Sequence, residues 1–335
     1  MRSALTTTPT APTAARWPHW LAVVTAAATL LLIVAGGVVT NTGSALAVPD
    51  WPTTFGQNMF LFPWSRMVGG VLYEHSHRLI GSAVGFLTVI LAIGLWLTES
   101  RRWVRRLAAV AVLAVILQGV LGGLRVVLLE HGLAIIHGCV AQAFFALMIS
   151  LAVITSSAWM AARPSAPVPT PAPDVRRLRP LALLTAPLVY LQLVFGALLT
   201  HTGTRLDAHL LGAAVVTACI GALAGRVLLR HTEHAALRRP ATLLLALLLV
   251  QLGLGLGAYI WRFTMLNQSM PLELGLLLLS AHRLTGTALW GTSVVLVLRI
   301  LRMAWATQGL LPQPARGARP HSGTLTAPQG GEVLA

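Results

Sequence analysis

The sequence predicts an all-α integral membrane protein whose eight transmembrane helices form two pseudo-symmetric four-helix bundles. The 335 residues are 56% hydrophobic and only 10% charged, and the mean hydropathy is +0.76, whereas soluble domains carry about 25% charged residues. Eight apolar runs are long enough to cross a hydrocarbon core of about 30 Å. Features of the first four runs recur in the same order in the last four. Together these observations exclude a water-soluble globular protein.

The apolar runs divide the chain into two halves of four spans each. They cover approximately residues 20–40, 77–97, 107–127, 133–157, 181–200, 209–229, 241–261 and 274–300. Between the fourth and fifth spans, residues 161–180 contain six prolines, which favours an extended cytoplasmic linker. We therefore expect a disordered cytoplasmic leader at 1–19, an N-terminal half at 20–160, a C-terminal half at 181–307 and a disordered cytoplasmic tail at 308–335.

The placement of arginine predicts the orientation in the membrane. The net charge is +15, and the chain contains no lysine. Six arginines fall on the side that we expect to be outside: Arg66, Arg78, Arg125, Arg205, Arg262 and Arg283. The other eighteen lie in the termini, at inner helix ends or in the connections after the second, fourth and sixth spans. Because positive residues concentrate in cytoplasmic loops, both termini are expected in the cytoplasm, and the charge reflects topology in a lipid bilayer rather than binding to nucleic acid.

Short motifs recur in the two halves and indicate an internal duplication. A Thr-x-Thr-Gly-[Ser/Thr] segment ends the first and fifth spans, and a Gln-x-x-x-Gly segment lies in the third and seventh. The matching ranges are 40–44 with 200–204, and 118–122 with 251–255. An even number of spans per half makes this a parallel repeat about an axis along the membrane normal.

Each half also contributes two histidines, near the starts of its second and fourth spans. They are His77 and His137 in the N-terminal half and His209 and His282 in the C-terminal half. Because even-numbered spans all begin on the outer side, the four imidazoles are expected in one layer near that membrane face. Neutral imidazole is a good iron ligand, and opposing helices of a four-helix bundle can hold a haem between two such side chains. The pattern predicts one bis-histidine haem in each half.

Other uses of these histidines fit the pattern less well. Zinc prefers three or four ligands that converge at one point, and a proton relay runs across the membrane rather than within one layer. The alternative to iron ligation for each imidazole is a hydrogen bond to the backbone or to lipid headgroups, and the case for this alternative is strongest at His209. The remaining histidines are expected outside the sites: His75 on another helix face, His131 and His201 at solvated helix ends, and His19, His231, His234 and His321 at the cytoplasmic surface.

Glu74 precedes His77 by three residues and therefore shares its helix face. One interpretation is an interfacial carboxylate paired with Arg78, four residues further on. The other is a carboxyl group that acts on the ligand bound at His77. The matching place before His209 holds Leu206 and Asp207 instead, so we expect one half to react and the other only to bind.

Taken together, these motifs resemble those of the haem A synthase family. The resemblance rests on Glu-x-x-His-Arg at 74–78, the outer-loop segments 42–44 and 49–52, the Gln-Gly-x-x-Gly-Gly run at 118–123, and His137 with His282. It covers residues 20 to about 305. It implies an eight-helix membrane enzyme that oxidises a ring methyl group of haem O to a formyl group, giving haem A for cytochrome oxidase.

The resemblance also implies residue roles and partners. It assigns His77 and His137 to the substrate haem O, Glu74 to the catalytic carboxylate, and His209 and His282 to the axial ligands of a haem b cofactor. It further implies a bacterial cytoplasmic (inner) membrane and, as partners, haem O synthase and cytochrome oxidase assembly factors; a homo-oligomer is left open.

The chain departs from the family pattern in two ways. It lacks paired cysteines in the outer loops, because Cys139 and Cys219 both lie within spans, where we expect packing residues. The connection at 201–208, which would cover the second haem, is very short.

Three other functions stay open on sequence grounds. The main alternative is a non-catalytic di-haem b-type membrane electron-transfer protein, although such carriers often place their haems at two depths. A transporter built on parallel repeats would contain no stoichiometric haem. A haem-binding chaperone without turnover differs from the enzyme only in the absence of an oxidised product.

Overall fold

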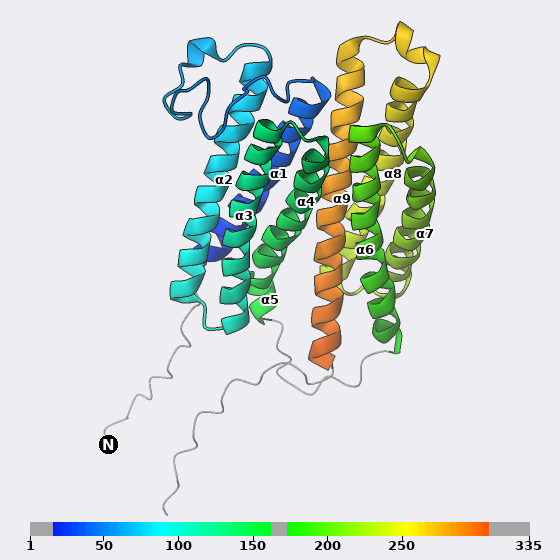
Figure 1. Cartoon of the computed structure of the whole chain (residues 1–335). Coiled ribbons are helices and arrows are strands. Elements are labelled where there is room, and N and C mark those ends of the chain that lie inside the picture. The colour runs from blue at the N-terminus through cyan, green and yellow to red at the C-terminus, as the bar shows by residue number, and fades with distance from the viewer. Residues whose placement is uncertain (1–15, 162–172, 308–335) are drawn as a thin grey trace, which may run out of the picture.

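The computed structural model describes residues 16–161 and 173–307, and every regular element in those ranges is a helix. Eight of these helices are long and apolar enough to cross a membrane (Figure 1). They are α1 (Trp17–Asn41), α2 (Gly70–Thr98), α3 (Arg102–Leu128), α4 (His131–Ile154), α6 (Pro173–Thr202), α7 (Leu206–Arg230), α8 (Ala235–Phe263) and α9 (Leu272–Thr307). The shorter elements are α5 (Ser157–Ala161) and the 3₁₀ helices η1 (Trp64–Arg66) and η2 (Met265–Ser269). The predicted all-α fold with eight membrane-spanning helices is confirmed.

Some boundaries differ from those predicted. The second helix, α2, begins at Gly70, so residues 74–78 lie inside it rather than at its opening. Helix α6 begins at Pro173, so residues 173–180 of the predicted linker are helical; proline is tolerated in a first helical turn because its missing N–H has no partner there. Residues 162–172 of that linker, residues 1–15 of the predicted leader and the predicted tail at 308–335 lie outside the described residues.

Helix contacts fall into two groups of four (Figure 1). In the first, α1 and α3 each contact α2 and α4; in the second, α6 and α8 each contact α7 and α9. Each group buries its own apolar core, around Met148 in the first and Leu223 in the second. Helix α9 also contacts α1 and α4. Half of the residues in its most apolar stretch are buried within the protein, against 11% in the corresponding stretch of α8. Helix α9 is therefore central, while the pseudo-symmetry of the two groups stays a prediction.

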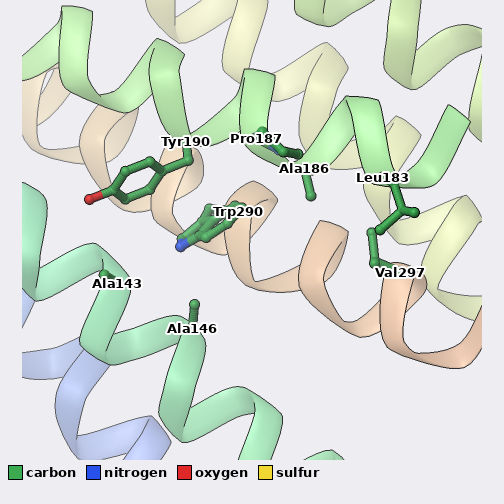
Figure 2. Close-up of a pocket in the computed structure, with 8 residues that line it drawn as sticks. All are labelled: Ala143, Ala146, Leu183, Ala186, Pro187, Tyr190, Trp290 and Val297. Atoms are coloured by element: carbon green, nitrogen blue, oxygen red, sulfur yellow. The ribbon is translucent and has the colours of Figure 1, made fainter. Parts of the chain in front are cut away.

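Hydrogen bonds and an apolar cleft mark the seam between the two groups. Gln142 on α4 donates to the Thr287 hydroxyl on α9 (2.9 Å), and the Trp290 indole donates to the Gln142 carbonyl oxygen (3.0 Å). Tyr190 on α6 donates to a carbonyl oxygen of α4 (3.0 Å). With their polar atoms bonded, the two aromatic rings line a cleft of about 420 Å³ between α4, α6 and α9 (Figure 2). Specific polar contacts as well as apolar packing thus hold the groups together.

The connection between α1 and α2, residues 42–69, folds over the end of the first group that is predicted to face outside (Figure 1). The Asp50 carboxylate organises part of it by accepting hydrogen bonds from the Thr53 hydroxyl and from the amides of Phe55 and Gly56. Burial acts to raise the pKa of Asp50, but these hydrogen bonds outweigh it and hold the pKa below its usual value. The Trp51 indole packs against Gly123 of α3, where any Cβ would collide with the ring.

Candidate functional site

The four predicted histidines occupy equivalent settings, each against a glycine on the preceding long helix. A Cβ atom added to that glycine would lie within 2.9 to 3.3 Å of the imidazole Cε1 atom, closer than ordinary van der Waals contact. The pairs are His77 with Gly36 (2.9 Å), His137 with Gly122 (3.3 Å), His209 with Gly196 (3.3 Å) and His282 with Gly255 (3.1 Å). Packing against a neighbouring backbone therefore fixes where each ring lies. At Gly122 and Gly255, the glycine-rich motifs make room for histidine.

In the C-terminal group, His209 and His282 lie beside each other. Their ring centroids are 6.4 Å apart, and the ring planes are inclined at 71°. Imidazole–metal bonds are about 2.0–2.1 Å long and the ligating nitrogen lies about 1.1 Å from the ring centre, so two rings on opposite sides of one ion have centroids about 6.3 Å apart. The observed centroid spacing is close to that of two imidazoles that ligate one metal ion, as in a bis-histidine haem.

Glutamine amides tie three of the four histidines to neighbouring helices. Gln192 on α6 donates to the carbonyl oxygen of His209 (2.8 Å), and its amide nitrogen lies 3.1 Å from Nδ1 of the ring. The Gln251 amide nitrogen on α8 lies 3.2 Å from each ring nitrogen of His282. Gln118 on α3 donates to the carbonyl oxygen of His137 (3.2 Å). The contacts to ring nitrogens of His209 and His282 restrict the orientation of those two rings, which matters for any metal ligand.

In the N-terminal group, His77 and His137 keep buried ring nitrogens without partners. In the described part of the chain, Nδ1 of each ring makes no hydrogen bond, although an unsatisfied buried polar group costs about 1–3 kcal/mol. The two imidazoles interact electrostatically with each other and with Arg125, so all three side chains lie in one region. This pair has unused capacity for a ligand.

Two arginines accompany the histidine pairs, and one of them, Arg125, also interacts electrostatically with the Glu74 carboxylate. Arg125 lies near His77 and His137, and Arg283, next to His282, packs its guanidinium against Gly37 of α1. Within the described ranges, neither forms an ion pair or a hydrogen bond. Sequence reasoning used both residues only for topology. Their side chains place positive charge beside each pair, which favours an anionic ligand.

Glu74 is 5% exposed and is held by two donors. Its Oε1 atom accepts from Arg78 (2.9 Å), and Oε2 accepts from the Val48 amide (2.9 Å). Arg78 also donates to the carbonyl oxygens of Val48, Asp50 and Thr53. The pairing of Glu74 with Arg78 therefore anchors the 42–69 connection and fixes a carboxylate one helical turn from His77, while its chemical role stays a prediction.

The C-terminal group lacks this carboxylate. Helix α7 begins at Leu206, which takes the position of Glu74, and Asp207 beside it is exposed. The outer turns that follow α1 and α6 are otherwise alike. The Thr42 and Thr202 hydroxyls each donate to the carbonyl oxygen four residues earlier (2.8 Å in both), and each is followed by a glycine with φ near +70°. The two halves thus share their turns and differ at the position of Glu74.

The other histidines have surroundings or positions of their own. His75 points under the outer connection, where it contacts the Thr54 hydroxyl (3.0 Å) and the Phe62 ring. His131 begins α4 and His201 lies in the last turn of α6. His19 contacts a carbonyl oxygen of α4 (3.0 Å).

The expectation that His231 is a surface residue is wrong. Its side chain is only 2% exposed because the chain folds back at the end of α7. His234 is partly exposed, as a residue at the edge of that turn should be. His321 lies outside the described residues.

Comparison with known proteins identifies the family. A family model described as cytochrome oxidase assembly protein matches residues 64–208. The heme A synthase of Shouchella clausii is 30% identical over 275 residues, which cover 80% of this chain and 85% of that protein. The heme A synthase of Halalkalibacterium halodurans is 29% identical over 180 residues, 53% of this chain and 57% of that protein. Since the similarity to the Shouchella clausii protein extends across both helix groups, the chain belongs to the haem A synthase family.

Proposed function

We propose that this chain is a haem A synthase, which oxidises a ring methyl group of haem O to the formyl group of haem A for cytochrome oxidase. The proposal rests on four histidines, two in each helix group, whose imidazole rings each pack against a glycine of a neighbouring helix. This pairing supports two haem sites of similar construction. Membership of the family and the eight apolar helices support the assignment of one site to substrate and one to cofactor, within a membrane.

The cofactor in this proposal is haem b, held by His209 and His282 as axial ligands. The 6.4 Å separation of their rings supports this assignment. Bound haem b supplies one-electron redox chemistry. The chain itself orients the ligands, because Gly196 and Gly255 seat the rings and the Gln192 and Gln251 amides contact them.

The substrate is haem O, bound through His77 and His137, and Glu74 is the catalytic carboxylate. Converting a methyl group to a formyl group (R–CH3 + H2O → R–CHO + 4 H+ + 4 e−) requires an external electron acceptor for the four electrons and a nearby proton acceptor for the protons. Glu74 is suited to this task because Arg78 and the Val48 amide hold its carboxylate in place. The absence of a carboxylate before His209 supports chemistry in the N-terminal half only.

Arg125 and Arg283 suit the propionate groups of the two haems. A guanidinium binds a carboxylate through charge-assisted hydrogen bonds, and neither residue has such a partner within the described ranges. Each lies beside one histidine pair.

The wider setting is proposed on the same basis. The arginine distribution supports both termini in the cytoplasm, and membership of the family supports a bacterial cytoplasmic (inner) membrane. Haem O synthase and cytochrome oxidase assembly factors are proposed partners, since the reaction stands between haem O supply and oxidase assembly. The alternative of a non-catalytic di-haem carrier is not favoured, because the relatives named above are heme A synthases.

The test is to co-express the protein with a source of haem O and to identify by mass the haems extracted from the purified protein. We expect haem b together with haem O, a hydroxylated intermediate or haem A. Glu74→Gln should keep total haem but lose the oxidised products. Asp207→Asn, the matched change in the other half, should keep them. Two haem b molecules per chain without modified haem would contradict the proposal, and so would an active Glu74→Gln variant.

A further inference from the structure

A second group of metal-binding side chains lies at the opposite end of the C-terminal helix group from the histidine pair. His231, Glu233 and His234 occupy the short connection between α7 and α8. One ligand atom from each residue lies within 4.8 Å of the other two. None of the three has a part in the proposed haem chemistry.

The backbone explains why these side chains converge. The His234 amide donates to the His231 carbonyl oxygen (3.1 Å), which closes a tight turn with the two histidines at its first and last positions. The turn is fixed at both sides. The His231 amide continues the α7 ladder by donating to Val227 (2.9 Å), and the His234 carbonyl oxygen accepts from Leu237 and Arg238 in the first turn of α8.

The side chains are arranged close to what a metal ion requires. The two imidazole rings are nearly parallel, at 17°, with centroids 6.1 Å apart. The Glu233 Oε1 atom lies 3.2 Å from Nε2 of His234, and adjacent ligands of a tetrahedral ion with bonds of about 2.0–2.1 Å are about 3.3 Å apart. The two ligand atoms that lie furthest apart, at no more than 4.8 Å, must therefore approach each other by about 1.5 Å at most. Rotation of the exposed Glu233 and His234 side chains can supply this movement.

We propose that His231, Glu233 and His234 form a binding site for a divalent transition-metal ion of the zinc class, which joins the end of α7 to the start of α8. Two imidazoles and one carboxylate are a familiar zinc donor set that leaves further positions for water. The site has an entry path, because the side chains of His234 and Glu233 are 42% and 60% exposed while His231 is buried. This proposal is independent of the haem sites.

Local charge makes Glu233 the sensitive ligand. Arg230, Arg238 and Arg239 in the flanking helix turns repel a cation, and Glu233 is the acidic residue of the three-ligand group. Replacing its carboxylate by an amide preserves shape but removes the charge that offsets the arginines. The carboxyl end of α7 favours a cation, but the amino end of α8 in the same turn disfavours one, so the carboxylate of Glu233 is left to offset the arginines.

The experiment measures Zn²⁺ binding to the full-length protein in detergent, purified with its haem, without a histidine tag and after chelator treatment. Equilibrium dialysis gives stoichiometry and affinity, and Co²⁺ absorption reports the ligand geometry. Wild type and Thr232→Ala, a matched change in the same turn, should bind one ion per chain in the micromolar range or tighter. Glu233→Gln and His234→Ala should weaken binding at least tenfold.

Because Glu233 is exposed and His234 partly exposed, the variants should fold, which unchanged haem absorption verifies. The proposal is overturned if wild type shows no saturable binding in micromolar Zn²⁺. It is equally overturned if Glu233→Gln and His234→Ala both bind as tightly as Thr232→Ala, because the ions would then occupy other histidines.

Discussion

Replacing Gly255 by alanine tests whether the glycines that pack against the imidazole rings position the haem ligands. The new methyl group would lie 3.1 Å from Cε1 and 3.5 Å from Nδ1 of His282. Carbon atoms pack best about 3.5–4.0 Å apart, so the imidazole must move by about 0.4 Å or more. Metal–ligand distances tolerate only about 0.2 Å. The shift should therefore weaken haem b binding in the C-terminal group by about 10- to 100-fold, the usual effect of disturbing a ligand's support.

The matched control is Gly253→Ala on the same helix. A Cβ at this position meets nothing within 4 Å, because residues two apart point about 200° away from each other around the helix. Both changes replace a mid-helix glycine and should favour the helix itself by a similar amount, about 0.5–1 kcal/mol. Any difference between the two variants therefore reports on His282.

The assay follows transfer of haem b from the purified protein to an excess of a haem scavenger, with haem O retained by the other site as an internal reference. The rate of haem b loss should rise about 10- to 100-fold in Gly255→Ala and stay at the wild-type value in Gly253→Ala. Equal rates in the two variants would refute the reasoning. Faster loss of haem O alone would mean that the two sites have been assigned in the wrong order.

Three further predictions concern the rest of the scaffold. Arg78→Met removes the partner of buried Glu74 and the donor to three carbonyl oxygens. It should therefore destabilise the protein by about 3–5 kcal/mol in thermal unfolding and expose residues 42–69 to protease. Stability equal to that of wild type would contradict this. Because the folded pKa of Asp50 lies below its usual value of about 3.9, its contribution to stability is complete above that pH and is lost as the pH falls through the folded pKa. Pepsin should then cleave the 42–69 connection more readily at lower pH, and in Asp50→Asn this dependence should be weaker; an identical pH profile would refute the assignment. Thr287→Val leaves the Gln142 amide without its acceptor and should lower the free energy of unfolding by about 1–3 kcal/mol. The control Thr292→Val, whose hydroxyl bonds within its own helix, should lower it by less. The reverse order would show that the hydrogen bond between Gln142 and Thr287 is unimportant.

Much of the fold follows from local properties of the sequence. The length and apolarity of each run determine that it spans a membrane, because no other packing satisfies the backbone within hydrocarbon. The spacings of three and four residues place His77 and Arg78 each next to Glu74 on the helix surface, because helical periodicity is local. The recurrence of Thr-x-Thr-Gly predicted equivalent turns after the first and fifth spans, and the hydroxyl contacts of Thr42 and Thr202 are equivalent. These features required no knowledge of tertiary contacts.

The remaining features depend on which helices meet, and only the tertiary structure decided them. The Gln-x-x-x-Gly repeat placed Gly122 and Gly255 at matching positions, but it did not reveal that each contacts a particular imidazole on the next helix. Gln192 has no counterpart in the first half, so the repeat gave no signal for its contact with His209. Burial of His231 was missed because a turn that folds back between two helices hides a residue whose local sequence is polar. Helical period and apolar length are properties of neighbouring residues, whereas a ligand pocket is formed by residues from different helices, whose distances are set by packing.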